Sequence, residues 1–346
     1  MPDTGPGTTQ RSRKRKPSVT VFIGVTNRLT TIKRTVASFA HLTTPHELVI
    51  VDNGTDHPDC LALLDRLERE KAVKRVYHFP PCDDMYRVAR HFNAAMREEY
   101  NAGGREWFAV SEADVCFDGT APDALDVYIA LAEEFGVAVG PHLRVDENIP
   151  TGYPLRSRVR ACETWMLYRD EMEWYEGVPF SRTQIDTTFH LFPRAPRFNR
   201  LHMNPIRVGP PYDAMHLDWY LDIFNPVPEN EIYIGGTRKV GSWGKQWLRD
   251  YWFWFQEEGP ERAWDLLLRE PMNLRDLCNT SFLKSWCLQY GVGVERNLDA
   301  SRDWLKSAIP YPNPRYWDRE ADWLKFVYED DMTALGWSGA KEEVAA

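Results

Sequence analysis

The sequence predicts an α/β protein built on a mostly parallel, doubly wound sheet. Short apolar, β-branched runs alternate with stretches whose apolar residues recur at helical spacing. Each apolar run ends in a polar turn, and the next helical stretch begins after that turn. Repeated strand–turn–helix units of this kind favour parallel strands with helices packed on both faces of the sheet.

The repeated units occupy the first third of the chain. Strands are expected at 19–25, 48–51, 73–79 and 107–110, with helical stretches around 32–39, 61–67 and 86–100 between them. The last strand runs directly into Glu112 and Asp114, two carboxylates one residue apart. Open α/β sheets bind ligands at the carboxyl ends of their strands. Taken alone, the pair favours a solvated acidic turn after a strand, so the interpretation as a ligand site depends on its neighbours.

Composition bounds the class of protein. The 346 residues are 43% hydrophobic and 27% charged, which is globular composition, and the net charge of −9 argues against a nucleic-acid partner. No apolar run approaches the ~20 residues of a membrane span. The six cysteines show no CxxC spacing, so neither a zinc site nor a disulfide framework is expected, and a cytoplasmic protein is the default.

Three parts of the chain are expected from shifts in composition. Residues 1–17 form a disordered tail with a basic run at 11–16, which can attract the chain weakly to the inner face of an anionic membrane. Residues 18–243 form the catalytic and ligand-binding domain. Residues 244–346 form a helical region, because ten of the fourteen tryptophans lie after residue 240 in helical patterns.

Two further polar turns follow the first and second strands. Thr26, Asn27 and Arg28 end the first strand, and Asp52 and Asn53 end the second. No GxGxxG follows the first strand, which counts against a dinucleotide-binding domain. An arginine can pair with phosphate, and an aspartate can accept hydrogen bonds from a base or from sugar hydroxyls. Three polar turns at one rim of the sheet therefore predict a nucleotide site.

The ordered motifs resemble those of the GT-A glycosyltransferases, especially a bacterial subgroup of glycosyltransferase family 2. VFIGVTNR, LVIVDNGT, ARHFNAAM and WFAVSEADV are similar to the family's first two strand–turn motifs, its Ala-Arg-Asn helix and its DxD motif. The segments GPHLRVDENIP, QIDTTFHLFPR and VGPPYDAMHLDWY extend the resemblance over roughly residues 18–245. Two positions depart from the pattern: Glu112 replaces the first DxD aspartate, and Asn53 replaces the second aspartate of the Asp-Asp-Gly turn.

The resemblance implies a GT-A (Rossmann-like) fold and a nucleotide-sugar donor, such as a UDP-sugar, held by Mn²⁺ or Mg²⁺. Asp114 is the expected direct metal ligand, with Glu112 as its variant partner and His216 as a late addition to the metal shell. His216 could instead be a packed, hydrogen-bonded histidine. The expected nucleotide-sugar contacts include Asn93 on the third helix and Trp243. Trp243 lies in a glycine-containing loop where Lys239 or Lys245 could reach the diphosphate, and this loop could equally be a plain interdomain linker.

An inverting enzyme needs a general base beside the acceptor hydroxyl. Asp186 holds the place of the family's base motif, and Asp218 is the alternative base; Asp186 could also simply cap a short helix. Asp146 and Glu147 are acceptor-side candidates that could equally form a surface ion pair. If Asp186 is only a cap and His216 binds metal, a retaining mechanism gains support.

The sequence does not favour one particular role for the helical region. The stretch 285–308 looks like one Sel1-type repeat, which we interpret as an accessory helical hairpin, since a single repeat cannot bury its own face. It could bind the acceptor glycan or small molecule, mediate homo-oligomerisation, or only pack. The leading function is a metal-dependent hexosyltransferase. The alternatives are a sugar-phosphate nucleotidyltransferase and an inactive GT-A adaptor that acts through its helices.

Overall fold

The computed structural model describes residues 17–82, 85–146, 148–157, 159, 163, 172–183, 185, 188–193, 205–236, 246–269 and 277–308. The expected basic tail therefore lies almost entirely outside the described residues, and so do Glu147, Asp186, Lys239, Trp243 and Lys245. The boundary expected between residues 243 and 244 also lies outside them.

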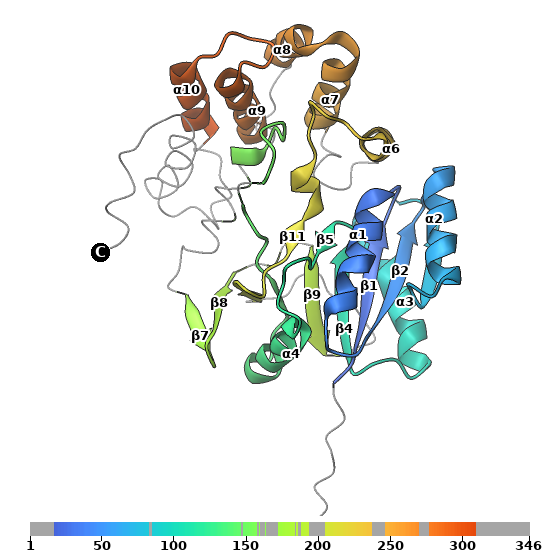
Figure 1. Cartoon of the computed structure of the whole chain (residues 1–346). Coiled ribbons are helices and arrows are strands. Elements are labelled where there is room, and N and C mark those ends of the chain that lie inside the picture. The colour runs from blue at the N-terminus through green and yellow to red at the C-terminus, as the bar shows by residue number, and fades with distance from the viewer. Residues whose placement is uncertain are drawn as a thin grey trace, which may run out of the picture.

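A nine-stranded mixed sheet organises the first two thirds of the chain (Figure 1), in the order β3-β2-β1-β4-β9-β6-β10-β8-β7. It contains β1 (Val19–Val25), β2 (His46–Asn53), β3 (Arg75–Phe79), β4 (Trp107–Glu112), β6 (Val139–Pro141), β7 (Glu173–Tyr175), β8 (Val178–Arg182), β9 (Phe189–Pro193) and β10 (Ile206–Val208). β1 pairs in parallel with both β2 and β4, while β9 runs antiparallel between β4 and β6. The prediction of an α/β protein with a mostly parallel sheet is confirmed.

Helices cover both faces of this sheet, because successive strand residues point to opposite sides. On one face, Val21 and Ile23 pack in a core with α1 (Thr30–Ser38), α2 (Pro58–Arg69) and α4 (Ala124–Phe135). On the other face, Phe22 packs in a smaller core with α3 (Met85–Asn101). The short 3-10 helix η1 (Phe39–His41) extends α1. The expected strands and helices of this half exist, with ends that differ by a few residues.

A second, two-stranded sheet pairs β5 (Val115–Cys116) with β11 (Met215–His216) in antiparallel fashion. After β11 come the 3-10 helix η2 (Leu217–Tyr220) and α6 (Pro228–Gly236). Figure 1 places β5 and β11 beside the large sheet, on the way to the helices at the top of the view. This small sheet brings residues about one hundred positions apart in the chain into register.

The C-terminal region is helical, with α7 (Gln246–Glu258), α8 (Pro260–Arg269), α9 (Leu277–Tyr290) and α10 (Leu298–Ala308). The predicted hairpin is present: α9 and α10 pack together, and the Ser285 and Ser301 hydroxyls lie 2.8 Å apart between them. A separate hydrophobic core joins α7, α8 and α9 to Trp219 and Tyr233. No described helix is both long enough and apolar enough to cross a bilayer.

Candidate active site

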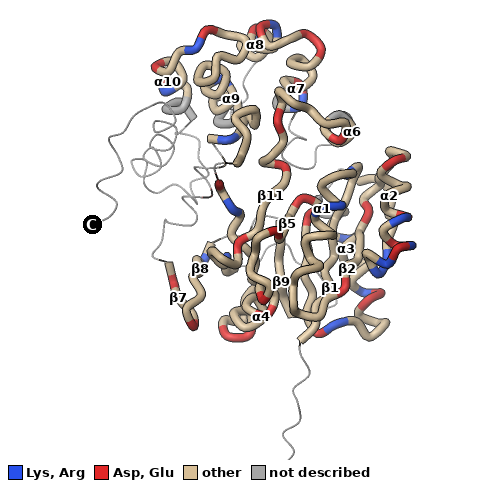
Figure 2. The backbone as a smooth tube through the Cα atoms, viewed as in Figure 1, with Lys and Arg blue, Asp and Glu red and all other residues tan. Residues whose placement is uncertain are grey.

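The acidic turn after β4 is positioned by the small sheet. Pairing of β5 with β11 sets His216 opposite Val115, the residue after Asp114. The Leu217 N–H also donates to the Asp114 carbonyl at 2.7 Å. Because these backbone contacts fix the two segments side by side, Asp114, His216 and Asp218 converge at the carboxyl end of β4. Figure 2 shows acidic residues near β5 and β11.

Three side chains at this point form a candidate cation site. One carboxylate oxygen each from Glu112 and Asp114 and one ring nitrogen of His216 lie within 4.8 Å of one another. Two carboxylate oxygens and one imidazole nitrogen are donor atoms that a divalent transition metal can bind. The predicted grouping of these three residues is therefore found in the structure.

Two buried atoms of this set lack hydrogen-bond partners among the described residues. They are Oδ1 of Asp114 and Nδ1 of His216, in side chains that are only 5% and 8% exposed. A buried polar atom without a partner is costly, so such atoms commonly belong to a ligand or ion site. The His216 ring also stacks on Trp219, with centroids 4.8 Å apart and planes 11° apart. The imidazole is thereby held in a defined orientation.

Arg28 lies at the same point and is held by two carboxylates. Its guanidinium donates two hydrogen bonds of 2.7 Å to the two oxygens of Asp218, and a third, of 3.3 Å, to Asp114. The Arg28 and Asp218 side chains are 6% and 2% exposed. Bidentate pairs of this kind combine charge with fixed geometry. The structure thus places Arg28, which the sequence suggested as a phosphate partner, on the proposed metal ligand Asp114.

Two buried carboxylates, those of Asp114 and Asp218, share the guanidinium of Arg28. Burial, followed by the neighbouring Asp218 carboxylate, raises the pKa of Asp114 well above its ordinary value, against the opposite pull of Arg28. Burial also tends to raise the pKa of Asp218, but Arg28 outweighs it and holds that pKa below its ordinary value. A divalent cation beside Asp114 would favour the ionised form of that carboxylate.

The rim at the carboxyl ends of β2 and β3 carries Asp52 in a hydrogen-bonded turn. One oxygen of Asp52 accepts from the Thr55 N–H at 2.9 Å, and the other lies 2.8 Å from His78 Nδ1. Gly54 has a φ of +77°, and a Cβ there would meet the backbone of Pro81 at 2.3 Å. The turn therefore requires glycine, and it fixes the Asp52 carboxylate at the strand end.

The turn after β1 is attached to this second turn. Asn27 adopts a φ of +49°, and its side chain donates to Asp56 at 2.8 Å and accepts from the Asp56 N–H at 3.1 Å. The Thr26 hydroxyl lies 2.9 Å from the Val25 carbonyl and 3.4 Å from the Asn53 carbonyl. The structure thus brings the first two predicted turns together as one hydrogen-bonded unit.

Other candidates have partners of their own. The Asn53 side chain donates to the Cys82 carbonyl at 3.0 Å and lies 2.9 Å from His91 Nδ1. Asn93 donates to the Ala89 carbonyl, one turn earlier in α3, at 2.7 Å. On the expected acceptor side, Asp146 accepts from the Tyr220 hydroxyl at 3.0 Å. These contacts place the residues without assigning them a ligand.

Sequence reasoning missed three residues that contact the acidic cluster or the segment directly after Arg28. Trp219 supports His216, the Tyr233 ring lies on Arg28 with its centroid 3.2 Å from the guanidinium carbon, and Glu229 binds the backbone just after Arg28. Trp219 lies within the MHLDWY segment, in which His216 and Asp218 were the predicted site residues. Glu229 and Tyr233 carry no local signal, because their partners are about two hundred residues away in the sequence.

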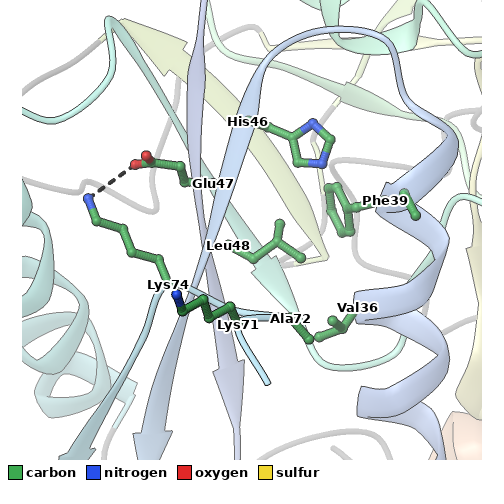
Figure 3. A pocket seen from close by; sticks show the side chains of 9 residues that line it. Val36, Phe39, His46, Glu47, Leu48, Lys71, Ala72 and Lys74 are labelled. Atoms are coloured by element: carbon green, nitrogen blue, oxygen red, sulfur yellow. Dashed lines mark hydrogen bonds and ion pairs between the residues drawn. The ribbon is translucent and has the colours of Figure 1, made fainter. Parts of the chain in front are cut away.

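A pocket of about 260 Å³ (Figure 3) lies at the end of the large sheet opposite to the acidic cluster. Val36, Phe39 and Leu48 line this pocket. At its edge, Lys74 Nζ forms an ion pair with Glu47 Oε2 at 3.1 Å. It lies at the amino ends of β2 and β3, whereas the acidic cluster lies at the carboxyl end of β4. The pocket is therefore separate from the candidate active site.

No protein-family model matches the chain, and no curated protein sequence matches it. Among solved structures, the chain is similar to the mannosyltransferase PcManGT from Pyrobaculum calidifontis in complex with GDP-Man and Mn²⁺, with 13% identity, a TM-score of 0.37, and coverage of 93% of this chain and 84% of that one. It is also similar to residues 1–349 of S. aureus TarS, with 12% identity, a TM-score of 0.37, and coverage of 91% and 82%. These values are low, so the fold and the site stand on the chain's own residues.

Proposed function

We propose that this protein is a metal-dependent glycosyltransferase that moves a hexose from a nucleotide-diphosphate sugar, with a UDP-sugar as the first candidate, to an acceptor hydroxyl. The observation that supports this most is the convergence of Glu112, Asp114 and His216 at the carboxyl end of a strand in a mostly parallel sheet. The polar turns after β1 and β2 end at the same edge. Such an edge can hold a nucleoside and its diphosphate together.

The donor set fits Mn²⁺ or Mg²⁺, with Mn²⁺ as our first choice. Carboxylate oxygens suit both ions, but an imidazole nitrogen suits a transition metal better than Mg²⁺. Asp114 would be the central ligand, since its Oδ1 is buried and without a partner among the described residues. When bound, a divalent ion supplies positive charge that stabilises the negative charge developing on the departing diphosphate.

Other residues of the chain would bind the donor's phosphate and nucleoside. Arg28 places a buried positive charge beside Asp114, where it can interact with a phosphate oxygen of the donor. Thr26, Asn27, Asp52 and Asn53 belong to the linked turns that we assign to the nucleoside, and Asn93 and Trp243 remain candidates for the sugar-nucleotide contact. Asp52 suits a base or ribose donor because its carboxylate is held rigidly by its own turn.

The reaction that we propose is a single displacement. The acceptor oxygen forms a bond to the anomeric carbon as the bond from that carbon to the phosphate oxygen breaks. The acceptor proton passes to a carboxylate, for which Asp186 is our first choice and Asp218 the alternative. Both oxygens of Asp218 already accept hydrogen bonds from Arg28, which is why we rank it second. The anomeric configuration of one product, read by NMR, tests inversion against retention.

Donor turnover gives the direct test of the proposed function. The wild-type protein is incubated with a panel of nucleotide sugars and Mn²⁺, and release of nucleoside diphosphate is measured with and without EDTA. We expect turnover of at least one donor, and loss of it when the ion is removed. Absence of nucleoside-diphosphate release from every donor, together with no nucleoside-diphosphate binding by calorimetry, would contradict the proposal.

A further inference from the structure

The helix α1 begins at Thr30, two residues after Arg28, without a capping group of its own. Leu29 stands at the N-cap position and makes no side-chain cap, and the first turn contains no acidic residue. The first N–H groups of a helix have no partners within the helix, so they need partners from elsewhere. The described neighbours supply one: Glu229, from α6.

The Glu229 carboxylate binds the start of α1. It accepts from the Leu29 N–H at 3.1 Å, from the Thr31 N–H at 3.2 Å and from the Thr31 hydroxyl at 2.9 Å, and also from the Thr30 N–H. The residue is 3% exposed. A negative side chain at this position also suits the helix dipole. Because the Glu229 carboxylate already accepts from the N–H groups at this end of α1, we assign the donor's diphosphate to Arg28 among the described residues of this segment.

Tyr233 lies one helical turn after Glu229 on the same face of α6. Its ring covers the guanidinium of Arg28, with the Arg28 Cζ 3.2 Å from the ring centroid. Stacking of a buried guanidinium on an aromatic face is attractive and restricts rotation of the planar group. α6 therefore contacts the segment 28–31 at two points. Glu229 accepts hydrogen bonds from the backbone of the segment, and Tyr233 stacks on the Arg28 side chain.

The position of α6 is itself fixed by the helical region. Tyr233 and Ile234 belong to the core that contains Tyr251, Trp252 and Trp286 of α7 and α9. Trp219, which stacks on His216, belongs to the same core. Both rings that support the candidate active site are thus backed by the tryptophan-rich helices.

We propose that Glu229 and Tyr233 are positioning residues that hold Arg28 in the orientation in which it serves the transition state. The proposal rests on the proposed function, because it assigns Arg28 a role at the donor's diphosphate. Arg28 donates two bonds to Asp218 in a fork, and this geometry fails if the guanidinium rotates or shifts. Negative charge grows on the departing diphosphate in the transition state, so the displaced arginine should cost kcat more than donor KM.

The kinetic test uses Glu229→Gln and Tyr233→Leu, with Tyr233→Phe as the matched control that keeps the ring. We expect the first two to lower kcat on the order of 10²-fold with little change in donor KM, and Tyr233→Phe to stay within about threefold of the wild type. Combined with Arg28→Lys, Glu229→Gln should lower kcat no further, because its effect passes through Arg28. Losses that multiply in the double variant would overturn the proposal.

An NMR measurement separates this proposal from the proposed function. The Arg28 Nε–H signal is assigned in ¹⁵N-arginine-labelled protein by its disappearance in Arg28→Lys. We expect the signal to shift or broaden in Glu229→Gln and Tyr233→Leu but not in Tyr233→Phe, whether or not any donor turns over. An unchanged signal in folded Glu229→Gln and Tyr233→Leu overturns the positioning role. If Glu229→Gln does not fold, the comparison of Tyr233→Leu with Tyr233→Phe decides the matter.

Discussion

Arg28 and Asp218, 190 residues apart in the sequence, form a two-point ion pair with both hydrogen bonds at 2.7 Å. The pair lies against Asp114, so the arginine and two aspartates share one buried space. Removing one partner of a buried pair leaves an uncompensated charge, which costs more than the pair contributes when intact. The relationship therefore joins the stability of the fold to the electrostatics of the candidate active site.

Arg28→Met should destabilise the protein by about 3–5 kcal/mol, because Asp114 and Asp218 would then face each other without their counter-charge. Urea denaturation at pH 7 measures the change. Arg34→Met is the matched control: the side chains of Arg34 and Asp118 are 49% and 46% exposed, so its loss should cost less than about 1 kcal/mol. Equal losses for the two variants would show that the buried pair has no special role in stability.

Asp114→Asn should weaken Mn²⁺ binding and lower donor turnover by about 10²–10³-fold, because it removes the proposed metal ligand at the centre of the acidic cluster. Calorimetry with Mn²⁺ alone measures binding, and nucleoside-diphosphate release measures turnover. Asp65→Asn, on the exposed side of α2, is the control and should change neither. Full Mn²⁺ affinity in Asp114→Asn would remove this residue from the metal site.

The ion pairs of Glu47 predict a pH-dependent contribution to stability that is unrelated to activity. Burial tends to raise the pKa of Glu47, but hydrogen bonds from Lys74 and Arg105 lower it below its ordinary value of 4.5. A carboxyl whose pKa is lower in the folded state stabilises the fold above the unfolded pKa, and this contribution is lost as the pH falls through the folded pKa.

We therefore expect Glu47→Gln to cost about 1 kcal/mol at pH 7 and progressively less below about pH 4.5. Urea denaturation of both proteins across this pH range measures the difference. Donor turnover at pH 7 should stay unchanged, since Glu47 lies at the opposite end of the sheet from Asp114. A difference in unfolding free energy that grows toward acid pH would contradict the assignment.

Trp286→Ala should destabilise the protein by about 3–5 kcal/mol, because the side chain is 2% exposed and its Nε1 donates to the Thr151 carbonyl at 2.8 Å. Trp174→Ala is the matched control: Trp174 is 67% exposed, so its change should remain within about 0.5 kcal/mol. Thermal unfolding measures both. A tolerated Trp286→Ala would mean that the helical region contributes little to the stability of the rest of the chain.

The order of elements and the acidic turn could be predicted from the sequence, because both depend on residues that are close together in the chain. Short β-branched runs that alternate with stretches of helical spacing indicate strands and helices in turn. The direction of the chain then shows which end of each strand is its carboxyl end. This is why Glu112 and Asp114 were found at the rim of the sheet, together with the turns at Thr26 and Asp52. The resemblance of the MHLDWY segment added His216 to the same site.

Which charged side chains come into contact depends on the tertiary packing. Antiparallel pairing of β5 with β11 brings His216 beside Asp114, and packing of α6 brings Glu229 and Tyr233 onto the segment that contains Arg28. Contacts between residues so far apart depend on the path of the whole chain, and no local pattern records them. The strand ends and the residue types at the site can therefore be predicted from local sequence patterns. The position of Arg28 between Asp114 and Asp218 depends on the packing of segments that lie far apart in the chain.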